Sequence, residues 1–205
     1  MHFVRRLSLL LSCVLGATTL CGAQSTSEWE TLRPEGEEFT ISMPKGSSFE
    51  SVKQPYHKME LNTRLYLSQS PAGPVFAIVS TSGIKSNPAL YTEMQRVNSY
   101  VDAFKDFLPA KVRPKTPTAK LTLVRETKLM GHPGREYKIT IGDLSGTMQA
   151  FATRRRFYAV VFLNTKPDET AQQQFLSSFM LPERLPDPPP PVVPRRLPDP
   201  RRAGA

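Results

Sequence analysis

Gly131–Tyr137 (GHPGREY) opens the stretch of sequence that decides the fold, because three strand-like runs follow one another from there. Residues 137–141 alternate between apolar and polar side chains, which is the period of a strand with one buried face. Thr147–Thr153 returns after a turn, and Phe157–Leu163 (FYAVVFL) is apolar on both faces, as in a central strand. Phe175–Leu181 (FLSSFML) then has the spacing of an amphipathic helix. The sequence therefore predicts a meander of adjacent strands closed by a C-terminal helix.

Further strands are expected earlier in the chain from the same alternation. Phe39–Met43 is the first, and Lys58–Ser68 follows with a break near Asn62. Val75–Ser80 is a short apolar run, and Leu121–Met130 leads into the stretch quoted above. Together with the meander, these runs indicate an antiparallel sheet.

One long helix is expected in the middle of the chain. Asn87 is placed to act as its N-cap and Pro88 to occupy the first helical position, while Pro109 is expected to stop it. Its apolar residues recur at spacings of three and four: Leu90, Met94, Val97, Val101, Phe104 and Leu108. Such a stripe covers a sheet. The predicted class is therefore α+β, with an antiparallel β-sheet covered by a long middle helix and a C-terminal helix.

The N-terminus has the three parts of a secretory signal. Arg5 and Arg6 supply the positive charge, Leu7–Leu20 is mostly apolar, and small residues lead to a cleavage site between Ala23 and Gln24. The apolar run is too short for a transmembrane helix, which needs about 20 residues. We expect an exported protein, periplasmic or secreted, with no transmembrane segment after cleavage of the signal.

Cys21 raises the alternative of a lipoprotein, whose signal is cleaved directly before a lipid-bearing cysteine. Leu20 disfavours this reading, because a small residue is expected immediately before that cysteine. Cys13 has a better preceding sequence but comes too early in the chain. Since both cysteines lie within the predicted signal, the mature chain is expected to lack disulfides, thiolate nucleophiles and cysteine metal sites.

The composition divides the chain into four segments. Residues 1–23 form the signal, residues 24–36 are polar and expected to be irregular, with Trp29 tucked against the domain edge, and residues 37–181 form the domain. In residues 182–205 we expect a disordered proline-rich tail, because nine of the nineteen residues from Pro182 to Pro200 are proline. The tail is interpreted as a solvated spacer, with a ligand for a proline-binding groove or a wall-spanning stalk as alternatives.

Few residues suggest catalysis or a metal site. The mature chain holds two histidines, His57 and His132, which lie far apart in sequence, whereas a metal site needs three or four converging ligands. Pairing of a histidine with Glu60 or Glu136 is conceivable but not favoured. Gly131 and Gly134 lack the lysine, the hydroxyl and the helix of a phosphate-binding loop, and no cofactor is expected.

Two other patterns are interpreted as structural. Gly142–Gly146 contains Ser145 but has the wrong spacing for a nucleophile elbow, so a turn between strands is expected. The adjacent acids Glu37 and Glu38 are expected to be solvated or to cap, as are Asp168 and Glu169 at the start of the last helix.

Charge gives the one functional direction in the composition. Removal of Arg5 and Arg6 from the 27 basic residues leaves 25 against 18 acidic residues, a net charge of +7. Arg154, Arg155 and Arg156 form the densest cluster and are candidate contacts for phosphate, acidic polysaccharide or lipid head groups. A solvated hairpin corner is the simpler interpretation.

The order of elements resembles the PsbP-like superfamily. The residues that carry the resemblance are Phe39–Pro44 (FTISMP), the long middle helix, Gly134–Tyr137 (GREY) among antiparallel strands, and Phe175–Phe179 (FLSSF) in a final helix. The resemblance spans about residues 39 to 181. It implies an exported protein similar to non-enzymatic binding and assembly factors, and it assigns no functional residue.

We therefore expect an exported, non-catalytic accessory or binding module of the bacterial cell envelope. Its partner would be another envelope protein or an anionic envelope polymer, and nucleic acid is not expected. The alternative is a surface-tethering protein that holds to anionic envelope polymers through its basic face and proline-rich tail. A hydrolase that uses Ser145 or a His-Glu pair is a minor alternative.

Overall fold

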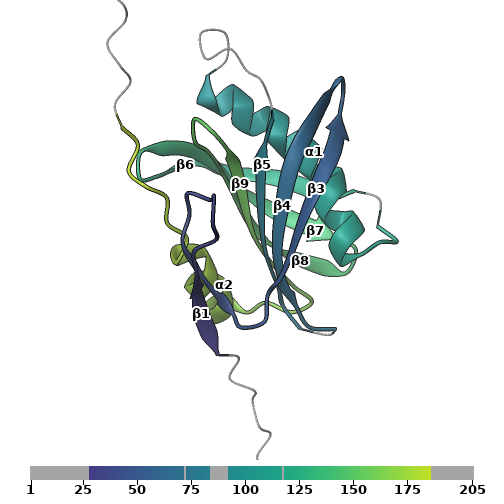
Figure 1. The fold of residues 1–205 in the computed structure, drawn as a ribbon. Coiled ribbons are helices and arrows are strands. Elements are labelled where there is room, and N and C mark those ends of the chain that lie inside the picture. The colour runs from purple at the N-terminus through teal and green to yellow at the C-terminus, as the bar shows by residue number, and fades with distance from the viewer. Residues whose placement is uncertain (1–27, 72, 84–91, 117, 186–205) are drawn as a thin grey trace, which may run out of the picture.

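The computed structural model describes residues 28–71, 73–83, 92–116 and 118–185. The predicted signal with its cleavage site, Cys21, and the tail from residue 186 lie outside the described residues. In chain order the elements are β1 (Trp29–Leu32), β2 (Ile41–Pro44), β3 (Ser48–Tyr56), β4 (Met59–Gln69), β5 (Val75–Ser82), α1 (Glu93–Val112), β6 (Lys120–Leu129), β7 (His132–Ile141), β8 (Leu144–Ala152), β9 (Phe157–Asn164) and α2 (Glu169–Ser177) (Figure 1).

The strands form one large antiparallel sheet and a small one. The large sheet has seven strands in the order β3-β4-β5-β9-β8-β7-β6, and β1 pairs with β2. The α+β class and the meander from β6 to β9 are thus confirmed. Phe157–Asn164 (β9) lies between β5 and β8, so the central strand predicted from its two apolar faces is also confirmed.

The two faces of the sheet carry two separate hydrophobic clusters. Within β9, Phe157, Ala159 and Val161 pack with the buried side of α1, whereas Tyr158 and Val160 pack with α2 and β2. Successive side chains of a strand point to opposite faces, so one apolar strand serves both clusters. Figure 1 accordingly shows α1 on one side of the sheet and the β1/α2 group on the other.

The long helix has other ends than predicted. Asn87 and Pro88 lie outside the described residues, and α1 begins at Glu93 with Thr92 as N-cap in a capping box with Gln95. Pro109 lies within the helix, which continues to Val112.

Pro109 is tolerated because another group replaces the hydrogen bond that proline cannot donate. The carbonyl of Lys105, four residues earlier, accepts the backbone N–H of Ala119 at 2.8 Å and the hydroxyl of Thr118 at 3.3 Å. Proline therefore did not end the helix, and the loop that follows α1 folds back onto it.

Three strand predictions need correction. The segment 24–36 is not wholly irregular, because Trp29–Leu32 forms β1, where the ring of Trp29 packs edge-on against Phe76. Ser48–Tyr56 (β3) was missed because it is a mostly exposed edge strand whose apolar residues do not alternate along its whole length. No break occurs near Asn62, which is paired with both Lys53 and Ser82.

The end of the domain also differs. The last helix ends at Ser177 instead of Leu181, and the chain then extends so that Met180 and Thr40 exchange backbone hydrogen bonds of 2.9 and 3.0 Å. Beyond Leu181, the Pro182 carbonyl lies 3.0 Å from His132 Nε2, and the Arg184 N–H donates to the Met130 carbonyl at 2.9 Å. The first residues of the predicted tail thus belong to the packed domain.

Candidate functional site

A β-bulge in the edge strand β6 decides which side chains reach the face of the sheet that α2 occupies. Leu123 lies opposite Tyr137, but Arg125 lies opposite Glu136, so Val124 is an additional residue in β6. A one-residue shift moves the following side chains to the opposite face. Leu121, before the bulge, packs on the α1 side, and the same alternation would have placed Arg125 there as well.

After the bulge, Arg125 joins a polar network on the α2 side. Its Nη2 donates to Glu136 Oε2 at 2.9 Å, and Gln149 Nε2 donates to the same oxygen at 3.3 Å. The Glu136 side chain is only 15% exposed, whereas that of Arg125 is 66% exposed. Both hydrogen bonds come from the neighbouring strands β6 and β8, so they hold the Glu136 carboxylate in the middle of this part of the sheet.

The helix α2 lines the other side of this polar region. Asp168 caps the helix, as predicted, by accepting the Ala171 N–H at 3.0 Å. Gln172 then accepts the Thr147 hydroxyl of β8 at 3.3 Å, and Gln173 and Ser177 follow on the same wall. The contact between Thr147 and Gln172 ties the helix to the sheet by a polar pair.

An apolar floor adjoins the polar network. The Phe151 ring stacks on Phe179 with centroids 6.0 Å apart, and Leu129, Leu176 and Met180 line the cavity beside them. Gly134 makes room for this floor, since a Cβ there would lie 2.4 Å from Phe151 Cδ1 and 2.5 Å from the Ala150 carbonyl oxygen. The role of Gly134 in the sequence GHPGREY is therefore to allow close packing of β7 against β8 and Phe151 at this floor.

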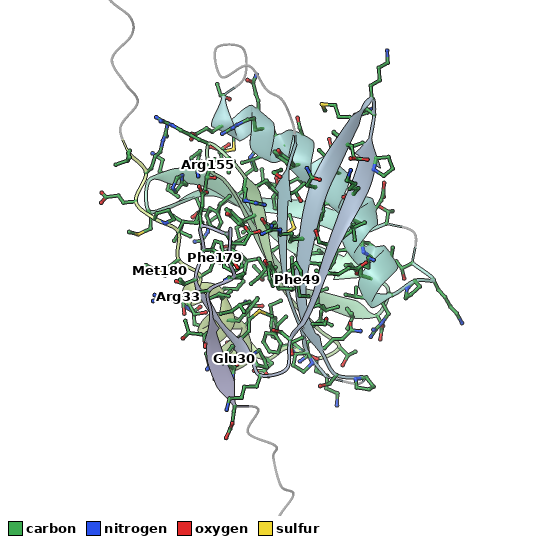
Figure 2. All side chains as sticks on the ribbon, viewed as in Figure 1. Glu30, Arg33, Phe49, Arg155, Phe179 and Met180 are labelled. Carbon is green, nitrogen blue, oxygen red and sulfur yellow. The ribbon has the colours of Figure 1, made fainter. Side chains whose placement is uncertain are left out.

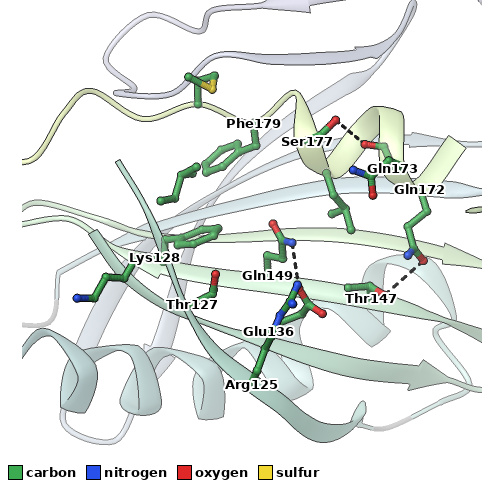
Figure 3. Close-up of a pocket in the computed structure, with 14 residues that line it drawn as sticks. Arg125, Thr127, Lys128, Glu136, Thr147, Gln149, Gln172, Gln173, Ser177 and Phe179 are labelled. Carbon is green, nitrogen blue, oxygen red and sulfur yellow. Dashed lines mark hydrogen bonds and ion pairs between the residues drawn. The ribbon is translucent and has the colours of Figure 1, made fainter. Parts of the chain in front are cut away.

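These residues enclose a pocket of about 360 Å³ between α2 and the strands β6, β7 and β8 (Figure 3). That volume lies near the lower end of small-molecule sites, at roughly 300–1,000 Å³. Its lining is mostly hydroxyl, amide and paired charged groups. Sequence reasoning missed it, although the polar residues of β7 and β8 at every second position were a signal for a sheet face that is not fully covered.

The structure separates the three arginines predicted as anion contacts. Arg155 is 83% exposed, with its Nε 3.9 Å from Glu38, and its position can be followed in Figure 2. Arg154 is also exposed, whereas Arg156 turns inward and its side chain is 18% exposed. The segment that connects β8 to β9 consists of Thr153, Arg154, Arg155 and Arg156. Arg96 of α1 donates a hydrogen bond to the Thr153 carbonyl at 2.8 Å.

Arg156 enters a buried network around Glu37, whose side chain has no exposed surface. Arg64 and Arg156 place Nη1 atoms 3.1 and 3.3 Å from Glu37 Oε1, and the Ser80 hydroxyl donates to Oε2 at 2.7 Å. Tyr158 donates to the same carboxylate at 3.3 Å, and burial raises the pKa of its hydroxyl well above the usual range. The prediction of a solvated or capping role for Glu37 was wrong.

His57 and Glu60, one of the pairs considered for hydrolysis, each contact another residue. Glu60 pairs with Lys53 at 3.0 Å, and the ring of His57 instead packs against Tyr56. Ser145 lies in β8 with Thr140 and Asn164 as its cross-strand neighbours, because the turn comprises only Gly142 and Asp143. Within the described ranges, no three residues of the types His, Cys, Asp and Glu are grouped to hold a metal ion.

His132 and Glu136 are likewise occupied by other groups. His132 is buried beside the Pro182 carbonyl, while Glu136 accepts from Arg125 and Gln149 in the pocket. Neither helix in the part of the chain that the structure describes is long and apolar enough to cross a bilayer.

No protein-family model matches the chain, and no curated protein matches it. Among solved structures, the chain is similar to the solution structure of cyanobacterial PsbP (CyanoP) from Synechocystis sp. PCC 6803. The TM-score is 0.48 and the sequence identity 13%, and the match covers 81% of this chain and 99% of that chain. A likeness at this TM-score and identity assigns neither a family nor a function to this chain.

Proposed function

We propose that this chain is an exported, non-catalytic binding module of the bacterial cell envelope. The observation that carries the proposal is the pocket between α2 and the strands β6 to β8, whose polar side chains converge from four elements. Convergent polar groups beside an apolar floor can fix the orientation of a bound small molecule or of the end of a polymer.

The bonding within the pocket favours binding over catalysis. The Glu136 carboxylate already accepts two hydrogen bonds, from Arg125 and Gln149, so it is engaged within the protein and is not directed at a bound molecule. The remaining polar lining consists largely of Thr and Gln side chains, which hydrogen-bond a ligand without exchanging protons at neutral pH.

The experiment tests export and binding in turn. The full chain is expressed in a bacterium with a periplasm, and the mass of the product identifies the position of signal cleavage. We expect the N-terminus at Gln24. A product that retains Met1 or carries a lipid on Cys21 contradicts the proposed export route. The purified product is then heated with a soluble digest of cell envelope, and a ligand of the folded state raises the midpoint of unfolding.

The assignment of binding to the pocket rests on a matched pair of variants. Gln172 lines the pocket, whereas Gln174 lies on the same helix outside its lining. We expect Gln172→Ala to lose the rise in unfolding temperature and Gln174→Ala to keep it. Equal behaviour of both variants and the parent chain in the digest contradicts binding at this pocket.

The basic corner formed by Arg154 and Arg155 supports a second candidate, a tether to anionic envelope polymers. The high exposure of Arg155 is the observation that favours it. Retention on isolated envelopes is compared at low and high salt for the mature chain and for a double variant, Arg154→Ala with Arg155→Ala. A control with Lys53→Ala and Lys58→Ala removes the same charge from β3 and the β3–β4 turn. Tethering predicts salt-sensitive retention that only the arginine variant loses.

The contribution of the proline-rich tail to tethering needs a third protein. The chain should end at Leu185, because Pro182 and Arg184 still contact the domain. If this shortened chain, the arginine variant and the mature chain are all retained alike at both salt concentrations, the tether is excluded.

A further inference from the structure

The pocket between α2 and the strands β6 to β8 also indicates which class of ligand it takes, if the proposed binding function holds. The geometry points to a neutral, polyhydroxylated ligand, a short oligosaccharide or the end of a longer glycan chain. The pairing of the charges, the chemistry of the uncharged lining, and the position of the apolar floor carry this inference.

Two of the three charged side chains that line the pocket are paired with each other. Glu136 accepts hydrogen bonds from Arg125 and Gln149, so its carboxylate does not need a cation from a ligand. Arg125 is likewise occupied by Glu136 across β6 and β7. Lys128 lies at the exposed rim. An uncharged ligand can add to this network without breaking any of its bonds, whereas a cationic ligand would compete with Arg125 for the Glu136 carboxylate.

The uncharged lining suits hydroxyl groups. Thr127 and Thr147 carry hydroxyls, and Gln149 and Gln172 carry amides, so each of the four side chains has both a donor and an acceptor. A ligand hydroxyl also both donates and accepts. Because Thr147 is bonded to Gln172 and Gln149 to Glu136, these groups are held in place before a ligand arrives, which lowers the entropy cost of binding.

The apolar floor fits the other surface of a sugar. Leu129 and Leu176 line the cavity together with the stacked rings of Phe151 and Phe179. A sugar ring presents C–H groups on its faces and hydroxyls at its edge, and so matches an apolar floor beside polar walls. Gln173, Lys128 and Met180 are exposed at the rim, so a longer glycan can continue outward into solvent.

The test is an NMR titration of the ¹⁵N-labelled chain from Gln24 to Ala205. The probes are a neutral N-acetylglucosamine oligomer, a neutral glucose oligomer, a uronate oligomer of the same length, and an acidic peptide. We expect a neutral oligomer to shift the side-chain amide signals of Gln149 and Gln172. Its binding should be insensitive to salt. Loss of one hydrogen-bonding group should weaken binding roughly tenfold.

Two variants separate binding from folding. Gln172→Ala and Thr147→Val each remove one partner of the helix-to-sheet contact. Both should weaken binding of the neutral oligomer, whereas Gln174→Ala should leave that binding unchanged. If the uronate oligomer or the peptide alone shifts these signals, the ligand class is overturned but the binding function stands. If none of the four probes shifts them, the inference fails, and the envelope digest described above then decides the proposed function separately.

Discussion

Arg125 donates a hydrogen bond to Glu136 across β6 and β7 at 2.9 Å, on the face of the sheet opposite to the one that Leu121 occupies. Leu121 and Arg125 are both odd-numbered residues of β6, so a strand without a bulge would have placed their side chains on one face. The single extra residue Val124 separates them. An irregularity of one residue in an edge strand therefore builds one wall of the pocket.

Deletion of Val124 should remove this arrangement. Either Arg125 would turn toward the α1 side, or Leu121 would leave it, and we expect a loss of roughly 1–3 kcal/mol in the free energy of unfolding. Urea unfolding measures it. Val124→Thr keeps the chain length at a side chain that is 58% exposed, so it should change stability by no more than about 0.5 kcal/mol. Equal stability of both variants would contradict the role of the bulge.

Gly134→Ala should destabilise the floor of the pocket. The new Cβ would overlap both the Phe151 ring and the Ala150 carbonyl oxygen, so we expect a loss of about 1–3 kcal/mol in thermal or urea unfolding. Adding Phe151→Leu should recover part of it, because the ring is one of the two obstacles. A Gly134→Ala variant as stable as the parent would show that the strands β7 and β8 can separate freely.

Glu37→Gln should be more damaging than Glu38→Gln. Removal of the Glu37 charge leaves the partly buried guanidinium groups of Arg64 and Arg156 without their shared anion, so a loss of roughly 3 kcal/mol is expected in urea unfolding. The Glu38 side chain is more exposed to solvent than that of Glu37, and its ion pair with Arg155 is long at 3.9 Å. Its replacement should cost about 1 kcal/mol, mainly through the hydrogen bond from Thr153. The reverse order would contradict the assignment of Glu37 as the central anion.

Asp143 should make stability depend on acid pH. The hydrogen bond from Arg113 lowers the pKa of its carboxyl below the ordinary 3.8. The charged form is therefore favoured in the folded state, and its stabilisation is present above the unfolded pKa and lost as the pH falls through the lower, folded value. The unfolding midpoint of Asp143→Asn should fall less steeply below pH 4 than that of the parent, and Asp106→Asn is a control on α1. Parallel curves for parent and Asp143→Asn would rule the contribution out.

Truncation should locate the end of the domain. A chain ending at Leu181 loses the contact of His132 with Pro182 and the bond between Arg184 and Met130, so it should unfold about 1–3 kcal/mol more easily than a chain ending at Leu185. The chain ending at Leu185 should match the full mature chain. If both truncated chains match it, residues 182–185 contribute nothing to folding.

The fold class followed from local patterns, and the candidate site did not. The alternation in β7 and the two apolar faces of Phe157–Leu163 reflect burial, which acts on each strand separately and can be read from the sequence. The bulge at Val124 is a property of two paired strands, so nothing in the sequence of β6 alone indicates it. The end of α1 was predicted wrongly for the same reason, since Ala119 satisfies the Lys105 carbonyl from outside the helix.

The sequence by itself determined the antiparallel meander and its central strand, because apolar side chains must leave water whatever their partners are. Only the tertiary structure decided the roles of the polar residues. It turned Arg156 toward the buried Glu37 while Arg155 stayed in solvent, and it placed Gln149 and Gln172 on facing walls of one pocket. A polar side chain can be satisfied by water or by many partners, so its partner is set by the register and packing of distant segments.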